Sequence, residues 1–325
     1  MKNQKTLTVY FAAALVLTGA AFAASLAVGR YPIDWMQLAT DGMDRKVFFT
    51  LRLPRTCMAM LAGFALGVAG SVYQAVFQNP LAAPDIIGVS SGASVGAAGA
   101  ILLFGGGVVL TALMAFAGGM AAVLTVLALA GFARRQGITG IVLAGIAVNA
   151  LTQALLMLLK LTADPEKQLA AIEFWTMGSF ADVTLTKLLG VLPLTMAGLA
   201  GLFVLHRQIL LLGLGEDEAR MLGVSVKSMR RAVLLLATLV TGAVVSVTGL
   251  ISFIGLLAPH IARLLMHSSR FSSTILAGVT GSVLLLCADI LARSIGSSEI
   301  PVSIITSLLG APFLFWLMCR KGDWE

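Results

Sequence analysis

Two pairs of charged residues stand at spacings that could do chemistry. Asp289 and Arg293 are four residues apart, so on a helix they would share one face in the orientation that favours an ion pair. Arg52 and Arg55 are three apart around Pro54, a residue that suits the first turn of a helix. Such groups can hold or bind charged partners, but neither pair supplies a nucleophile or an acid–base couple.

The patterns that usually mark catalysis or metal binding are missing. The sequence has no Gly-x-x-x-x-Gly-Lys-Ser/Thr loop and no His-Glu-x-x-His, and no cluster of carboxylates lies inside an apolar run. Cys57, Cys287 and Cys319 stand alone in or beside apolar runs, which is typical of packing residues. His260, which follows Pro259, is more typical of a packed histidine than of a ligand. We therefore expect no enzyme, no cofactor and no metal site.

The composition indicates a polytopic membrane protein. Of 325 residues, 58% are hydrophobic and only 11% are charged, and the mean hydropathy is +0.97. Soluble domains carry about 25% charged residues. The formal charge of +7 lies mostly in short loops between apolar runs, where it reports topology and contact with anionic lipid rather than binding to nucleic acid.

Ten apolar runs are long enough to be considered as membrane helices. The first resembles a signal peptide, but about 22 residues can cross the hydrocarbon, so we expect a first span with its positive end inside. The expected spans are 7–28, 54–77, 88–104, 108–133, 139–161, 188–205, 232–250, 251–267, 273–293 and 301–319.

The predicted fold is therefore an all-α membrane protein, a polytopic bundle of about ten transmembrane helices that forms one domain over residues 1–325. Both termini are expected in the cytoplasm, with the protein in a bacterial inner membrane. The basic residues assigned to the cytoplasmic side are Arg134, Arg135, Arg207, Arg220, Lys227, Arg230, Arg231, Arg270, Arg320 and Lys321. Arg52 and Arg55 then lie at the outer surface, against that tendency, where they would meet either the lipid interface or an acidic protein partner.

Residues 206–231 form the longest water-compatible passage in the second half of the chain. Most connections are about 4 to 6 residues long, so this one should have its own structure and its own partner. Acids near Glu216, a run Ala219–Leu222, the breaking Gly223 and a following basic stretch indicate two short cytoplasmic helices joined by a turn. The open alternative is a solvated surface loop.

Three further patterns concern packing. Gly88, Gly92 and Gly96 recur every four residues, so they would line one helix face and allow close packing in lipid. Asn149 and Gln153 are one helical turn apart and are expected to form hydrogen bonds between helices. Trp175 and Phe180 fit an external helix at the membrane interface.

A channel or an ion-coupled secondary transporter is the first functional alternative. Such carriers place ionisable groups or broken helices near the middle of the bilayer. The expected spans offer mostly Ala, Leu, Val, Gly, Met and Thr at that depth, which does not favour ion coupling.

Several stretches together resemble the permease subunits of type II ABC importers, the family that carries iron-siderophore complexes, haem and cobalamin. The resemblance extends over almost the whole chain in order. The matching stretches are 51–55, 79–82 with 88–93, 175–179, 215–223, 253–256 with 259–263, Asp289 to Arg293, 299–301 and 310–313.

This resemblance implies an ATP-driven importer of a bulky metal chelate, with an iron-siderophore complex as the first expectation and haem, cobalamin or an oxyanion behind it. The partners it implies are a second copy of the chain, two cytoplasmic ATPase subunits, and a periplasmic or lipid-anchored binding protein. It assigns coupling to the ATPase to Glu216, Ala219, Arg220, Leu222 and Gly223; a cytoplasmic gate to Asn79, Leu81 and Thr139; and binding-protein docking to Arg52, Arg55 and Arg293.

Two stretches depart from the family pattern. The run after the eighth span reads Met266 to Arg270, of which only Arg270 carries over. Ser303 stands where glycine is common, which puts close helix packing there in doubt.

Overall fold

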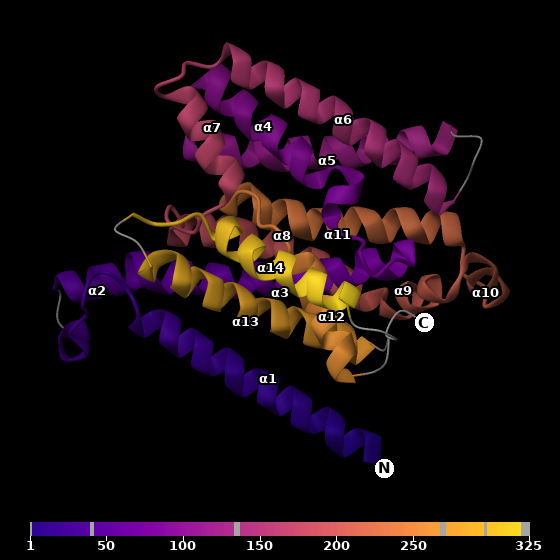
Figure 1. Cartoon of the computed structure of the whole chain (residues 1–325), viewed down its shortest axis with the longest axis horizontal. Helices are drawn as coiled ribbons and strands as arrows, with labels where there is room; N and C mark the ends of the chain where they lie inside the picture. The colour runs from indigo at the N-terminus through magenta and orange to yellow at the C-terminus, as the bar shows by residue number, and fades with distance from the viewer. Residues whose placement is uncertain (1, 40–41, 133–136, 267–270, 296–297, 320–325) are drawn as a thin grey trace.

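The computed structural model describes residues 2–39, 42–132, 137–266, 271–295 and 298–319. Within these ranges every regular element is helical (Figure 1). The elements are α1 (Lys2–Ala27), η1 (Trp35–Ala39), α2 (Met43–Val47), η2 (Phe48–Arg52), α3 (Leu53–Phe77), η3 (Pro84–Ile87), α4 (Val89–Phe104), α5 (Val108–Phe132), α6 (Ile138–Thr162), α7 (Gln168–Met177), α8 (Leu185–Val204), α9 (His206–Leu214), α10 (Glu216–Met221), α11 (Val226–Thr248), α12 (Ile254–Met266), α13 (Phe271–Ser294) and α14 (Val302–Cys319).

Seven helices of the described chain are long and apolar enough to cross a membrane. Three more apolar helices, α4, α12 and α14, are shorter. At about 1.5 Å per residue, α12 is only about 20 Å long, less than the hydrocarbon thickness. An all-α, multi-pass membrane protein is thereby confirmed, while the count of ten spans stays a prediction.

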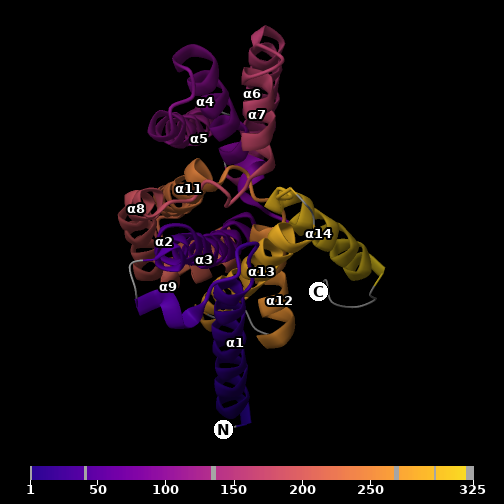
Figure 2. The same ribbon diagram turned by 90° about the vertical axis from the view of Figure 1, so that its left-hand side faces the viewer.

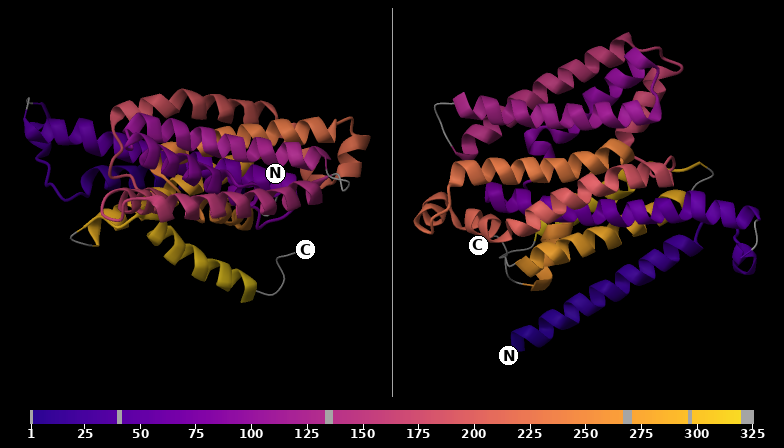
Figure 3. Two further views of the ribbon diagram at one scale, coloured as in Figure 1. Left: turned by 90° about the horizontal axis from the view of Figure 1, so that it is seen from above. Right: turned by 180° about the vertical axis from the view of Figure 1, so that it is seen from behind.

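The long helices run side by side, so the bundle has two ends (Figure 1). We call them the α10 end, where α9, α10 and the first residues of α1, α6 and α11 lie, and the α7 end, where α2 and α7 lie. Seen from behind, α1 lies obliquely along the outside of the bundle (Figure 3). Seen from above, α14 diverges from the other helices (Figure 3). Of the basic residues expected in the cytoplasm, five lie outside the described residues: Arg134, Arg135, Arg270, Arg320 and Lys321.

Helix α3 is the buried centre of the bundle, and glycines allow its neighbours to reach it. A side chain at Gly63 would overlap the carbonyl of Gly281 on α13, and one at Gly67 would overlap the carbonyl of Ala277. The two backbones therefore touch, which is how helices associate in lipid.

The glycine stripe expected after residue 88 is confirmed in part. A side chain at Gly96 would overlap the carbonyl of Met114, and one at Gly92 would meet Gly118 and Ala122, so α4 packs directly on α5. Gly88 is not part of this face, because it precedes α4 with φ +76° and turns the chain into the helix.

Two expected elements are different in the structure. The short helices of 206–231 are α9 and α10, joined at Gly215 with φ +145°, and the basic stretch after Gly223 already belongs to the long helix α11. Phe180 is fully buried rather than interfacial, since the chain turns inward at Gly178 after α7 ends.

Candidate functional site

At the α7 end, Arg55 joins two carboxylates from distant parts of the chain. Its Nε and Nη2 donate to Asp289 Oδ1 over 3.0 and 2.8 Å, and its Nη1 donates to both oxygens of Glu299 over 2.9 and 3.0 Å. Asp289 on α13 is fully buried, and Glu299 precedes α14. Arg55 therefore ties α3, α13 and the start of α14 together, with its two donor edges fully used.

Arg293 and Arg52 extend this cluster to α1. Arg293 Nη2 lies 3.4 Å from Asp289 Oδ2, so the expected ion pair is confirmed, and it also donates to the carbonyl and hydroxyl of Ser25. Arg52 donates to the carbonyls of Leu26 and Ala27 in the last turn of α1, and to that of Tyr31 just beyond the end of this helix.

The three arginines, which were expected at the outer surface, lie together at the α7 end with their side chains largely covered by the protein. Arg52, Arg55 and Arg293 are only 5%, 9% and 6% exposed. Glu299 was missed, because it is 244 residues from Arg55 and no local spacing connects them. Contact of these arginines with a binding protein stays a prediction.

At the α10 end, Glu216 connects three segments. Its carboxylate lies 3.2 Å from Arg220 Nη2 on the same helix and 2.8 Å from Arg230 Nη2 on α11. Arg230 is almost fully buried. A methyl group at Gly137, just before α6, would lie 2.9 Å from Glu216 Oε1. Helix α10 is thus held by charge to α11 and lies against the start of α6.

The predicted coupling residues differ in what they present. Leu222 is 60% exposed and the neighbouring Met221, which the sequence analysis did not single out, is 80% exposed. Ala219 is fully buried and packs inward. Gly223 has φ +82°, a left-handed conformation that disfavours side chains with a Cβ. The tip of α10 is therefore a small exposed apolar surface on a rigid turn.

The expected gate residues lie in two segments. Asn79 Oδ1 accepts the backbone N–H of Leu81, which fixes the turn after α3, and both residues are exposed. Thr139 is exposed in the first turn of α6. Asn79 also lines a cavity of about 400 Å³ that α9 closes on one side. Within the described chain the structure brings Asn79 and Leu81 together but records no bond from either to Thr139.

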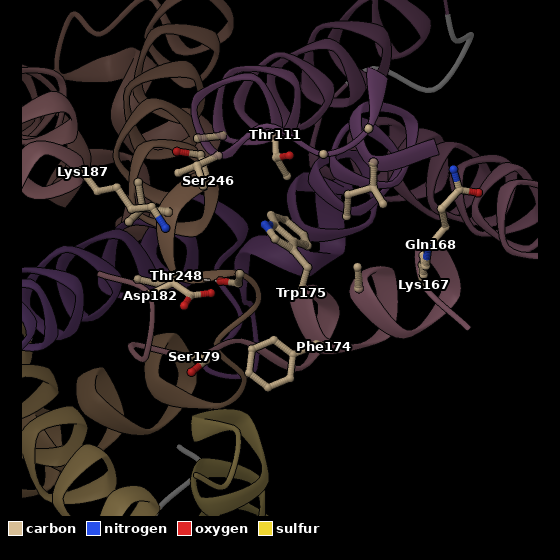
Figure 4. Close-up of a pocket in the computed structure, with 18 residues that line it drawn as sticks. Thr111, Lys167, Gln168, Phe174, Trp175, Ser179, Asp182, Lys187, Ser246 and Thr248 are labelled. Carbon is tan, nitrogen blue, oxygen red and sulfur yellow. Dashed lines mark hydrogen bonds between the residues drawn. The ribbon is translucent and has the colours of Figure 1, made fainter. Parts of the chain in front are cut away.

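A cavity of about 500 Å³ lies at the α7 end between α5, α7, α8 and α11 (Figure 4). Trp175 stands near its centre, with Lys187, Asp182 and Thr111 among the labelled residues around it. Trp175 is half-buried and lines this cavity, while the position of α7 at the membrane interface stays a prediction.

A second polar region lies at the middle of the bundle, although the expected spans are mostly apolar at that depth. Two adjoining cavities of about 190 and 210 Å³ share Asp85, Ser90, Ile251 and Ser252. The smaller cavity is also lined by Asn149 and Gln153, which lie in the central turns of α6. These two amides therefore face a cavity, rather than the neighbouring helix that their spacing indicated.

Asp85 was overlooked because it belongs to a proline-bracketed turn, which reads as a surface loop. One sequence signal lies next to it. The run Gly88–Gly92 has the spacing Gly-x-Ser-x-Gly, which draws attention to Ser90, the hydrogen-bond partner of Asp85. Here that run is no hydrolase nucleophile turn, because it follows a 3-10 helix and Ser90 Oγ donates to the Asp85 carboxylate.

Comparison with known proteins gives one consistent result. Residues 15–320 match the FecCD transport family. The chain is 36% identical to the hemin transport system permease protein of Yersinia pestis, over 89% of this chain and 87% of that protein. It is also 36% identical to the Fe(3+) dicitrate transport system permease protein of Escherichia coli K12, over 94% of this chain and 96% of that protein.

The fold matches a solved structure as well. A structure described as an inward-facing metal-chelate type ABC transporter is 32% identical and superposes with a TM-score of 0.88, covering 96% of this chain and 99% of that one. With nearly the full length of the chain covered, its helices follow one known architecture.

Proposed function

Because the chain belongs to the FecCD transport family, we propose that it is the permease of an ATP-driven importer that moves a metal chelate from an external binding protein to the cytoplasm. The chain is an ABC permease subunit and not an enzyme, and it is a multi-pass protein of the inner membrane. The observation that carries the proposal is the agreement of sequence and fold over nearly its full length with metal-chelate permeases.

The partner at the α10 end is proposed to be a pair of ATPase subunits, one for each permease copy. The exposed Met221 and Leu222 offer an apolar contact, and Glu216, Ala219, Arg220 and Gly223 hold the shape of that tip. Burying one or two large apolar side chains contributes about 1.5 to 3 kcal/mol each.

Nucleotide-driven movement of the ATPases would then act on α10. Glu216 lies against Arg230 on α11 and near Gly137 before α6, so a shift of α10 would move the inner ends of two long helices. A ligand shifts such a two-state bundle only by its different affinity for the two states. The gate proposed at Asn79, Leu81 and Thr139 lies at this same end.

A second copy of the chain is proposed to cover α14. This helix diverges from the bundle (Figure 2) and exposes Ile304, Leu308, Leu309, Phe315 and Trp316. A shallow apolar hollow along it is lined by Met177 from α7 as well as by Ser303 and Ser307. Two copies joined along α14 would place α6 and α14 of each copy around a shared path.

Docking of the binding protein is proposed at the α7 end. Arg52, Arg55 and Arg293 support it as the basic centre of that end, although their present partners bury them. Contact with an acidic partner would have to exchange part of the bonds to Glu299, the most exposed acid of the cluster. The first expectation for the cargo is an iron-siderophore complex, with haem and cobalamin as further candidates.

Reconstitution tests the proposal. The purified permease in liposomes should move no ferric chelate alone, and should move it when an ATPase subunit, ATP and the binding protein are all added. Transport by the permease alone along an ion gradient, at the same rate, would overturn the proposal in favour of a secondary transporter.

A further inference from the structure

Asp85 carries an inference about the cargo, which rests on the proposed function. We infer that Asp85 is the charged contact of a polar section of the transport path, and that this section binds a cationic group on the cargo.

The fold holds Asp85 at the middle of the bundle although it belongs to a turn. A side chain at Gly145, in α6, would overlap the carbonyl of Ile86, so η3 lies directly on the helix backbone. Ile87 is fully buried. Pro84 lies close to α12, since its Cδ would be 3.5 Å from a Cβ atom built at Gly255. These contacts fix the backbone of η3 inside the protein against the third turn of α6, one turn before Asn149.

The packing of η3 leaves the Asp85 side chain uncovered. Its carboxylate lines both central cavities and is exposed in them. Around it stand the Ser90 hydroxyl, which donates to it, the Ser252 side chain, and the amides of Asn149 and Gln153. A carboxylate, two amides and two hydroxyls make a surface that can replace part of the hydration of a passing cation.

No Lys, Arg or His of the described residues forms an ion pair with Asp85. The contrast is Asp289, which is also inside the protein but lies against Arg55 and Arg293. A carboxylate away from bulk water is costly unless a positive charge or a proton compensates it. A path that opens onto Asp85 would supply that compensation from the cargo, and would repel a polyanionic chelate.

The position of the cavities fits a path. They lie beside α6, and α6 and α14 diverge from each other on one side of the molecule (Figure 2). In the proposed dimer this side faces the second copy, so each copy would contribute one Asp85. The two carboxylates would make the middle of the path selective for positive charge.

Cysteine labelling tests the charge without knowledge of the cargo. In the permease–ATPase complex, with Cys57, Cys287 and Cys319 replaced by alanine, Gln153→Cys is labelled by a cationic and by an anionic methanethiosulfonate reagent of similar size. Adding Asp85→Asn should lower the ratio of the cationic to the anionic rate by about tenfold, whereas the control Asp182→Asn, at the α7 end, should not change it. An equal ratio with and without Asp85 overturns the inference.

Transport tests the preference for cargo. Two ferric tris-hydroxamate chelates that differ only in a free ammonium or an acetylated amine are compared in the complete transporter, with rates divided by capture on the binding protein. The ammonium form should be preferred by about tenfold in the wild type, equivalent to about 1.4 kcal/mol, and not in Asp85→Asn.

The outcomes separate the two proposals. Transport of both chelates without a charge preference overturns the inference and leaves the proposed function intact. Transport of neither, in liposomes where the ATPase hydrolyses ATP, contradicts the chelate function, and the labelling rates then decide the charge at Asp85 alone.

Discussion

Single residues in this permease show how an ionic group is kept inside a membrane protein. Asp289 is fully buried, and Arg55 and Arg293 approach it from two helices at 2.8 and 3.4 Å. Desolvating such a cluster is expensive, and its close geometry offsets that cost without making it a large source of stability. Its clearer role is orientation, because its bonds run to α1, α3, α13 and the start of α14.

Arg55→Met should lower the free energy of unfolding by about 3 to 5 kcal/mol, because it leaves a buried carboxylate with one weaker partner. The measurement is the thermal unfolding of the purified permease in detergent. Glu299→Gln, at a site that is 28% exposed, should cost much less.

The double variant Arg55→Met with Asp289→Leu removes both charges and should recover most of the loss. If Arg55→Met instead keeps the melting temperature but no longer captures the binding protein, Arg55 acts by docking and the structural role proposed for it is wrong.

Among the elements, α4 and α5 show what close packing depends on. Gly96 and Gly99 are on the same helix, but their surroundings are opposite. A side chain at Gly96 would enter the backbone of α5, while one at Gly99 would meet nothing within 4 Å. Glycine is therefore needed at one position and free to change at the other.

Gly96→Ala should destabilise the protein by about 1 to 3 kcal/mol, since α4 and α5 must move apart. Gly99→Ala should be neutral or stabilising by up to about 1 kcal/mol, because alanine favours the helix more than glycine does. Thermal unfolding in detergent compares the two, and equal effects would show that the α4–α5 contact does not limit stability.

At the scale of the whole molecule, transport requires that events at the α10 end reach the path. The connection runs from Glu216 to buried Arg230 at the start of α11 and to Gly137 before α6. The side chain of Asp217 beside it is 90% exposed, and among the described residues its one ion pair is with Arg220, at 3.9 Å. Glu216 therefore connects α10 to α11, whereas Asp217 contacts a residue of its own helix.

Glu216→Lys should reduce ATP-driven transport by about tenfold or more while the permease stays folded in the membrane, because the new charge repels Arg220 and Arg230. Gly223→Val, which forces a β-branched residue to φ +82°, should do the same. The control Asp217→Lys should transport nearly normally. Normal coupling in Glu216→Lys, measured as transport per ATP hydrolysed, would remove α10 from the coupling route.

Much of this architecture could be predicted from local sequence. Apolar runs predicted the long helices, the pair Asp289 and Arg293 predicted its own ion pair, and Gly92 and Gly96 predicted a closely packed face. The bounds of the short helices within 206–231 were predicted less accurately. The apolar run before Gly215 forms the short helix α9, and its sequence could equally have ended a membrane span.

By itself the sequence determined what short-range physics controls: hydropathy, helix periodicity, the turns, and the motifs that resemble the family. Tertiary structure alone decided which charges are satisfied. Arg55 binds Glu299, which is 244 residues away in the sequence. Asp85 belongs to a turn that the sequence suggests is a surface loop, yet it lines cavities at the middle of the bundle. The physical reason is that burial and ion pairing are properties of packed neighbours, and Gly145 brings η3 onto α6 through a contact that no local spacing encodes.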